Sequence, residues 1–318
     1  MCSSDLLTSA CAASCVAMAA DAPKTFDVPA DGRMTVSVND RTLEAFSSPG
    51  MPTSLSITRA VASTMFGGDA EAKADRAARR FKLVSVSRNP DAKVGPVLVK
   101  GFFMDARVQV GPYAGKAPIK WSQTDAYGFA DVLAGPYAIP APVVRYHLHN
   151  AGGPEDTSSL PLMPPSAWWV AATYKDIGGK RIKFALAPQF ATSVASAAAG
   201  AAISAELGGA LSGSEERVLI SHGVARPTRM MRLNVPLRLG PISLNQLLVR
   251  IADHGSAASI PKDADPAETT GDVVVRGKRR PSHASYIVYL GADALQGCSS
   301  ITYDKPRHLI DLSCAGPR

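Results

Sequence analysis

Short stretches in which apolar and polar residues alternate, each ended by turn residues, are spread along most of the chain. Residues 108–112 (VQVGP) and 237–241 (LRLGP) alternate in this way and end in Gly-Pro, and residues 143–148 (VVRYHL) and 309–312 (LIDL) form further strand-like runs. Alternation with a period of two is typical of β-strands with one buried face, and Gly and Pro interrupt such strands. The pattern predicts a mainly β protein.

Composition agrees with this fold class. The chain has 26 glycines and 24 prolines among 318 residues, so we expect many turns and short elements. Hydrophobic residues make up 46% of the chain and charged residues 19%, which allows a core and excludes a disordered protein. Residues 71–80 carry charges at helical spacing. The alanine-rich residues 195–210 form a helix or a loose connection, because glycines interrupt them.

One pattern occurs twice. Residues 39–56 align with residues 178–195 without a gap, and each segment begins with a two-residue turn signal, Asn-Asp in the first and Gly-Gly in the second. Further on, the two Gly-Pro strands match each other, and the apolar pair before Gly135 matches the pair before Gly291. Three matches in the same order predict two copies of one β-rich unit.

The repeat divides the chain. Residues 25–150 form a first lobe and residues 168–318 a second, and the Pro-, Ser- and Gly-rich segment 151–167 links them. The second lobe contains a polar insert at 253–285, acidic in its first half and basic in its second. Residues 1–20 are small and apolar and end in Ala-Met-Ala, which indicates a signal peptide, damaged or truncated because no basic residue precedes the apolar stretch.

Export would place the cysteines in an oxidising compartment and so affects whether they pair. Cys298 and Cys314 are the two of five that lie beyond residues 1–20. An even number in an oxidising compartment favours a disulfide, here closing a loop of about 15 residues; two buried free thiols are the other interpretation. We expect the disulfide, in a periplasmic or secreted protein.

The repeated unit resembles the aspartic protease family, which includes pepsin-like and retropepsin-like enzymes. Residues 177–186 (IGGKRIKFAL) are similar to the strand that leads to the family's Asp-Thr-Gly. Residues 289–295 (YLGADAL) resemble its Leu-Gly-x-Asp-x-Leu segment, and residues 304–312 resemble its last strand. The resemblance covers most of residues 170–318 and is weaker over 30–150. It implies two similar acid-protease-like β-barrel lobes, related by internal duplication, with a cleft between them.

The catalytic residues of that family are replaced. In the family each lobe contributes one aspartate, and the two carboxylates share a proton and activate a water molecule. We therefore assign no catalytic residue, and we expect the degenerate dyad positions, together with Gly135 and Gly291, to mark a peptide-binding cleft. The equivalent positions hold no carboxylate; they are Ser48-Pro49-Gly50, the first triplet, and Ala187-Pro188-Gln189, the second triplet.

The pattern favours an exported pseudoprotease that binds an extended peptide or protein segment between the lobes, because strand addition uses backbone groups rather than carboxylates. The alternative is an active aspartic endopeptidase with a displaced acid pair. A pair of lobes with a purely structural role is a third reading. The aspartates near the equivalent strands have no counterparts in the other lobe; they are Asp40, Asp131, Asp176 and Asp293. No cofactor is predicted.

Three histidines are further candidates. His147 and His149 lie two apart on a predicted strand and face one side, as metal ligands can, but the sequence shows no third ligand nearby. We interpret them as exposed strand residues and assign no metal site. His222, in Ser221-His222-Gly223, could pair with a serine in a catalytic triad, but no serine lies in a G-x-S-x-G motif.

Charge and hydropathy limit the partners. The net charge is +7, but only residues 276–280 (RGKRR) form a basic block, with no zinc spacing and no aromatic-studded basic strand. We therefore predict no nucleic-acid binding. After the first 20 positions no run of 18 or more uncharged apolar residues occurs, so no integral membrane span is expected. The predicted partner is a peptide or protein segment, and the oligomeric state is left open.

Overall fold

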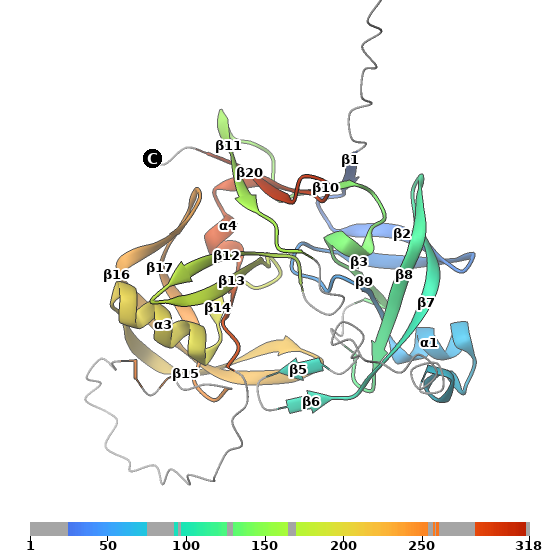
Figure 1. Ribbon diagram of the computed structural model, residues 1–318, viewed down its shortest axis with the longest axis horizontal. Helices are drawn as coiled ribbons and strands as arrows, with labels where there is room; N and C mark the ends of the chain where they lie inside the picture. Colours follow the sequence, from blue (N-terminus) through green and yellow to red (C-terminus); the bar gives the residue numbers. More distant parts are fainter. Residues whose placement is uncertain are drawn as a thin grey trace, which may run out of the picture.

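The computed structural model describes residues 25–74, 92–94, 97–125, 130–164, 170–253, 257, 259–260 and 284–315 (Figure 1). The predicted signal peptide at residues 1–20 and most of the insert at 253–285 lie outside the described residues. The described part is mainly β, as the sequence predicts. None of its helices is long and apolar enough to cross a membrane.

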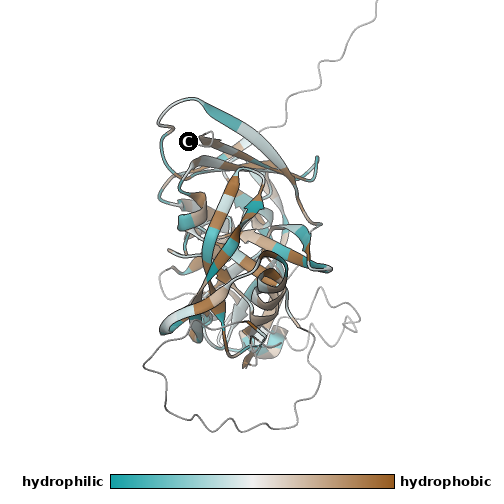
Figure 2. Ribbon diagram, turned by 90° about the vertical axis from the view of Figure 1, so that its left-hand side faces the viewer, coloured by the Kyte–Doolittle hydropathy of each residue, from teal (hydrophilic) through white to brown (hydrophobic). Residues whose placement is uncertain are grey.

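The first half of the chain contains a closed barrel with the strand order β2-β3-β9-β4-β8-β7. Buried and exposed positions alternate along β2 and along the second half of β7, so one face of each of these strands lies in the core. In Figure 2, which looks onto the second half of the chain, hydrophobic and hydrophilic positions likewise alternate along the strands nearest the viewer. Trp121 is 1% exposed and stacks on Phe66 and Phe102, with ring centroids 5.6 and 5.7 Å away. The six strands are β2 (Arg33–Val38), β3 (Arg41–Ser47), β4 (Leu55–Ile57), β7 (Gly101–Val110), β8 (Tyr113–Ser122) and β9 (Val132–Ala134).

The second half forms a seven-stranded sheet with the order β12-β13-β18-β14-β17-β16-β15. Its strands are β12 (Ala172–Ile177), β13 (Lys180–Leu186), β14 (Val194–Ala195), β15 (Ala210–Ser221), β16 (Val224–Leu239), β17 (Ile242–Arg250) and β18 (Ile287–Leu290).

Four pairings occur in the same order in the barrel and in this second sheet. In the barrel, β3 is parallel to β9, β9 antiparallel to β4, β4 parallel to β8, and β8 antiparallel to β7. In the second sheet, β13 is parallel to β18, β18 antiparallel to β14, β14 parallel to β17, and β17 antiparallel to β16. The same strand pairings therefore occur around both predicted triplets.

The expectation of a second barrel is wrong. The second sheet stays open, with β12 and β15 at its edges. In the first half, pairing of β2 with β7 closes the barrel. In the second half, helix α3 (Ala197–Leu207) contacts both β12 and β16, the strands that would have to pair for closure. The helix itself confirms the helical interpretation of residues 195–210.

The two predicted hairpin turns are present. Asn39 and Asp40, between β2 and β3, have φ angles of 47° and 66°, and Gly178 and Gly179, between β12 and β13, have φ angles of 55° and 67°. Two successive residues with positive φ are typical of the type I′ turn that connects twisted antiparallel strands. Asparagine and aspartate tolerate this conformation better than other residues with a Cβ atom, and glycine adopts it freely.

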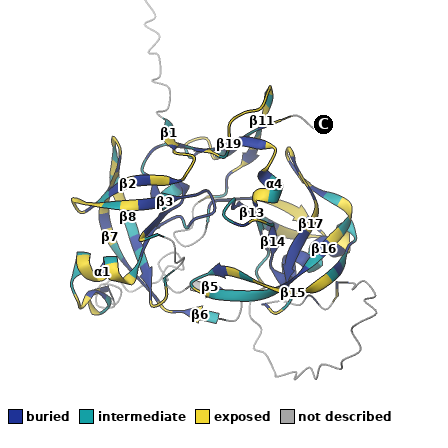
Figure 3. Ribbon diagram, turned by 180° about the vertical axis from the view of Figure 1, so that it is seen from behind, coloured by how far each residue is buried: buried dark blue, intermediate teal, exposed yellow. Residues whose placement is uncertain are grey.

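Helix α1 (Arg59–Phe66) follows β4, as α3 follows β14, and was not expected. Thr58 caps α1 by accepting a hydrogen bond from the Val61 amide at 3.3 Å. Half of the residues of the helix are exposed, and only Ala62 is buried (Figure 3). Of the predicted helix at 71–80, residues 71–74 are helical and the remainder lies outside the described residues.

A five-stranded sheet with the order β1-β10-β19-β20-β11 draws strands from both halves of the chain. The segment predicted as a linker, 151–167, contributes β11, which pairs with β20 along its whole length. These strands are β1 (Thr25–Val28), β10 (Val143–His147), β11 (Glu155–Pro161), β19 (Cys298–Asp304) and β20 (Leu309–Ala315). The remaining short elements are β5 (Ala92–Val94), β6 (Val97–Val99), η2 (Pro136–Ala138) and α4 (Ala292–Leu295).

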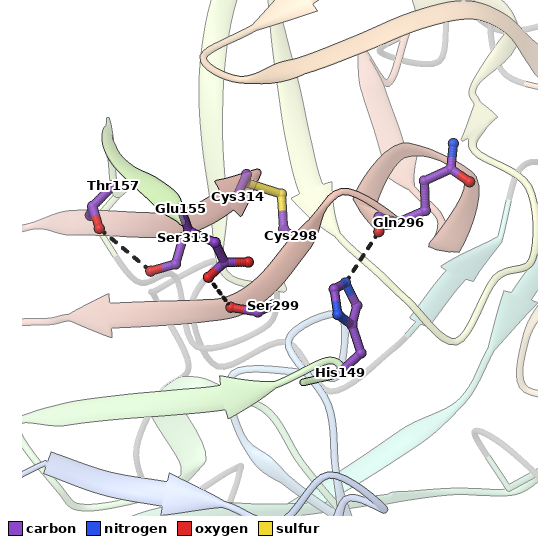
Figure 4. The surroundings of a disulfide bond; sticks show 8 residues. All are labelled: His149, Glu155, Thr157, Gln296, Cys298, Ser299, Ser313 and Cys314. Carbon is purple, nitrogen blue, oxygen red and sulfur yellow. Dashed lines mark hydrogen bonds between the residues drawn. A yellow bond between two sulfur atoms is a disulfide. The ribbon is translucent and has the colours of Figure 1, made fainter. Parts of the chain in front are cut away.

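The predicted disulfide is present within this sheet. Cys298 at the start of β19 and Cys314 near the end of β20 are register partners, and their sulfur atoms lie 2.02 Å apart (Figure 4). Both residues are 3% exposed. Beside the bridge, the His149 imidazole lies 3.1 Å from the Gln296 carbonyl oxygen. The disulfide thus joins two strands that lie between β10 and β11.

Lys305, in the turn between β19 and β20, connects the C-terminal strands to the first half of the chain. Its Nζ donates hydrogen bonds to the carbonyl oxygens of Ile139 at 2.6 Å and Pro136 at 3.2 Å. Burial lowers the pKa of Lys305 to about 8. The lysine supplies donors to backbone acceptors in the η2 segment.

Candidate functional site

The structure brings the two triplets together. The Ser48 hydroxyl donates a hydrogen bond of 3.0 Å to the Gln189 side-chain oxygen. A Cβ atom on Gly50 would lie 2.7 Å from the Ala187 Cβ and 2.5 Å from the Gln189 Nε2, so no other residue fits at position 50 without a shift. The triplets therefore contact each other across the junction between the barrel and the second sheet.

Equivalent backbone hydrogen bonds position the two triplets. The first follows β3, and the Ser48 amide donates to the Ala134 carbonyl at 3.3 Å. The second follows β13, and the Ala187 amide donates to the Leu290 carbonyl at 2.7 Å. Each loop then turns back through an amide three residues later, since Met51 donates to Ser48 and Phe190 donates to Ala187, both at 3.0 Å.

Gly135 and Gly291 lie behind these loops. The Gly135 amide donates to the Pro52 carbonyl at 3.1 Å, and the Gly291 amide donates to the Ser193 hydroxyl at 3.0 Å. A Cβ atom on either glycine would lie under 3 Å from backbone atoms of the neighbouring loop. Both glycines therefore support the triplets from the interior.

The chemistry of the junction is that of neutral side chains. The pair in contact is a hydroxyl and a carboxamide, and neither exchanges a proton near neutral pH. Ser48 is 3% exposed, and the Gln189 Nε2 is buried without a hydrogen-bond partner. A dyad of the aspartic protease type needs two carboxylates within about 3 Å of each other. These two triplets cannot perform that acid and base chemistry.

A pocket of about 200 Å³ opens at the junction. It is bounded by both triplets, by the turn after β1 and by the end of β10. Ser48, Pro49, Pro188 and Gln189 line it, whereas Gly50, Ala187, Gly135 and Gly291 do not. The other lining residues are Pro29, Ala30, Asp31, Gly32, Phe46, Ser47, Tyr146, His147 and Leu148.

The interior of this pocket has fixed polar groups. The Ser47 hydroxyl donates to the Ala134 carbonyl at 2.8 Å and lies 3.1 Å from the Tyr146 hydroxyl. Burial raises the pKa of Tyr146 well above its usual range, and the hydrogen bond to Ser47 opposes this only in part. Tyr146 therefore stays protonated and donates its hydrogen to Ser47.

Charges lie at the exposed side of the pocket. The Asp31 carboxylate accepts a hydrogen bond of 3.0 Å from the Arg33 amide. The His147 Nε2 lies 3.0 Å from the Asp27 carboxylate, and both side chains are about half exposed, which limits the strength of this pair. An incoming segment would meet the Asp31 carboxylate at the entrance, and inside it would meet apolar walls together with the hydroxyls of Ser47 and Tyr146.

The other candidates from the sequence are apart from this junction or have structural partners. His149 does not share a partner with His147, because its two ring nitrogens lie 2.9 and 3.1 Å from the carbonyl oxygens of Asn150 and Gln296. The Asp293 carboxylate accepts hydrogen bonds from the Ser193 hydroxyl and amide at 2.7 and 2.9 Å. Among the described residues no group of three or more His, Cys, Asp or Glu side chains could hold a metal ion.

The hydrogen bonds between Asp293 and Ser193 were not predicted from the sequence. The two residues are 100 positions apart, and only the repeated Thr-Ser before each short strand pointed to that loop. In the first half the corresponding Ser54 hydroxyl is buried without a hydrogen-bond partner. The two loops therefore differ in how firmly their serine is held.

The tip of the β15–β16 hairpin lies against the barrel at a second contact. His222 and Ser221 are adjacent there, with the imidazole Nδ1 3.0 Å from the hydroxyl. A Cβ atom on Gly223 would be in ordinary contact, 3.4 Å, with the Thr124 side chain. Burial and the nearby charge of Lys120 lower the pKa of His222 to about 4. The imidazole is therefore neutral at pH 7.

Lys120 makes stability depend on pH. Burial lowers its pKa in the folded chain from 10.5 to about 7. Between these values the unfolded chain binds more protons, so the free energy of unfolding rises with pH, by up to about 1.4 kcal/mol per pH unit. We expect urea denaturation at pH 7, 8 and 9 to show this rise.

The Lys120→Met variant should show a smaller rise than the wild type between pH 7 and 9, because Lys305, with a pKa of about 8, still titrates in it. Lys116→Met is the matched control, because Lys116 lies on the same strand with an exposed side chain. Parallel stability curves for the wild type and Lys120→Met would contradict the assignment.

Comparison with known proteins adds no identification. No protein-family model matches the sequence, and no curated protein matches it either.

Proposed function

We propose that this protein is an aspartic-protease-like pseudoprotease that binds an extended peptide or protein segment at the junction of its two triplets. The observation that carries the proposal is the contact between Ser48 and Gln189, 3.0 Å, beside a pocket that residues of both triplets line. The two equivalent triplets meet there, and neither contains a carboxylate. The site therefore has the position of a cleft without the acid pair of a hydrolase.

An internal duplication is part of this proposal. It is supported by the four strand pairings that occur in the same order in the barrel and in the second sheet. It is also supported by the equivalent hydrogen bonds of the two loops, from Ser48 to Ala134 and from Ala187 to Leu290.

The size of the pocket favours a peptide over a free small molecule. Its volume of about 200 Å³ is below the roughly 300–1,000 Å³ of pockets that enclose drug-sized ligands. It accommodates one side chain of a longer segment. The apolar walls suit an apolar side chain, and Asp31 at the entrance suits a neighbouring basic residue.

We also propose that the protein is exported to the periplasm or secreted. The disulfide between Cys298 and Cys314 supports this, because such bonds persist in oxidising compartments. The protein purified from periplasmic or culture fractions should start after the predicted signal peptide at 1–20, which N-terminal sequencing would test.

Peptide binding can be tested with a proteome-derived peptide library. The purified protein is mixed with the library at several pH values from 3 to 8, and retained and cleaved peptides are identified by mass spectrometry. We expect retained peptides and no cleavage. In the Ala30→Trp variant the indole would fill the pocket, because Ala30 lines it, and we expect retention to fall about tenfold or more.

Ala114→Trp is the matched control, because Ala114 is exposed on β8 and does not line the pocket. Equal retention by both tryptophan variants and the wild type would contradict binding at the junction. Cleavage that persists through purification, and that a statine-type inhibitor blocks, would instead favour an active endopeptidase with an acid pair elsewhere.

A further inference from the structure

A small hairpin from the first half of the chain packs against the second sheet. It consists of β5 and β6, and its Val94, which is 3% exposed, forms an apolar cluster with Val194, Ile220 and Leu248. These three residues belong to β14, β15 and β17. The cluster is completed by the partly buried side chains of Val218, Val224 and Met230.

Apart from Val94, the cluster is built entirely by the second sheet. Val194 and Leu248 are register partners on adjacent strands and form its floor. Ile220, with its neighbours near the tip of the β15–β16 hairpin, forms its wall. The β5–β6 hairpin is seen beside β15 in Figures 1 and 3. The second sheet thus provides an apolar groove, and Val94 occupies it.

The hairpin is attached to the groove through side chains rather than a strand ladder. β5 and β6 pair with each other and with no other described strand, over three residues each. A two-stranded hairpin of this length has little stability of its own. Leu98 of β6 is 59% exposed, so part of the hairpin's apolar surface is not used.

We infer that the β5–β6 hairpin is an internal occupant of a binding groove on the second sheet, which a partner's extended apolar segment takes when the hairpin is displaced. The partner segment would place a β-branched or similar apolar side chain where Val94 lies. The groove shares no residue with the junction pocket, so this inference does not depend on the proposed function. The bound hairpin would then inhibit binding of the partner segment.

The hairpin's own sequence supplies the probe. A fluorescein-labelled peptide of residues 91–100 (DAKVGPVLVK) is titrated against the full-length protein, and binding is followed by fluorescence anisotropy. In the Val94→Asp variant the tethered side chain can no longer occupy an apolar site without burying an unpaired charge. We expect this variant to bind the peptide at least tenfold more tightly than the wild type.

Three controls locate the effect. Leu98→Asp alters an exposed residue of the same hairpin and should bind like the wild type. The double variant Val94→Asp/Leu248→Asp damages the groove floor and should lose the gain. A peptide with aspartate in place of its valine at position 94 should bind none of them.

The inference would be overturned if Val94→Asp bound the peptide no better than the wild type. It would also be overturned if urea denaturation showed that Val94→Asp does not fold. That outcome would make the hairpin an obligatory part of the core rather than a displaceable occupant. The same measurement on Val94→Ala, which removes most of the contact without adding charge, should show an intermediate gain in peptide affinity.

Discussion

The Gly135→Ala variant is expected to lose about 3 kcal/mol of folding free energy, at the upper end of the range for overpacked cores. A Cβ atom at this position would lie 2.4 Å from the carbonyl oxygens of both Met51 and Pro52. These are backbone atoms, so no change of side-chain rotamer relieves the overlap. The Gly135 amide also donates to the Pro52 carbonyl, which holds the two segments together.

Urea denaturation followed by circular dichroism measures this loss. Gly152→Ala is the matched control, because a Cβ atom there meets nothing within 4 Å, and we expect a change within about 0.5 kcal/mol. Gly291→Ala should resemble Gly135→Ala, since its Cβ would lie 2.7 Å from the Phe190 carbonyl oxygen. Equal effects at Gly135 and Gly152 would show that the loop behind the first triplet yields easily.

Reduction of the disulfide is expected to lower the free energy of unfolding by about 3 kcal/mol, the value of the loop-entropy model for a closed loop of this size. The bridge spans a sequence separation of 16 and joins β19 to β20. Reduction frees the unfolded chain more than the folded one. Urea denaturation with and without dithiothreitol measures the difference.

The Cys298→Ala/Cys314→Ala variant is the control for this experiment. Without reductant it should match the reduced wild type to within the error of the measurement, because both cysteines are buried and alanine leaves only a small cavity. Adding reductant to the variant should change nothing, which separates this bridge from the three cysteines within residues 1–20. A wild type that is insensitive to reductant would contradict the prediction.

Local signals predicted much of the fold. The turn residues at 39–40 and 178–179 adopt the positive φ angles that hairpins need, and the alanine-rich segment forms α3. Features that depend on distant partners were not predictable. The segment 151–167 has the composition of a linker, yet β11 forms there because β20 offers a complete edge to pair with. The second sheet stays open, and α3 contacts both β12 and β16; no local pattern in the sequence shows this arrangement.

The candidate site, too, could be predicted from the sequence only in part. The gap-free repeat predicted which triplets correspond, and in the structure Ser48 and Gln189 are in contact. The pocket beside them could not be predicted, because its walls also come from Ala30 after β1 and Leu148 after β10. These residues lie outside both triplets and their flanking strands, and they carry no motif. Only the three-dimensional arrangement of the five-stranded sheet brings them to the junction.

The order of strands in that sheet has a consequence for biosynthesis. β19 and β20, the last strands of the chain, lie between β10 and β11, which are made about 150 residues earlier. Until β19 and β20 have been synthesised, each of these earlier strands has an open edge that can pair with another chain. The sheet therefore cannot be completed before these two strands emerge, and a ribosome stalled near residue 290 would hold an aggregation-prone chain.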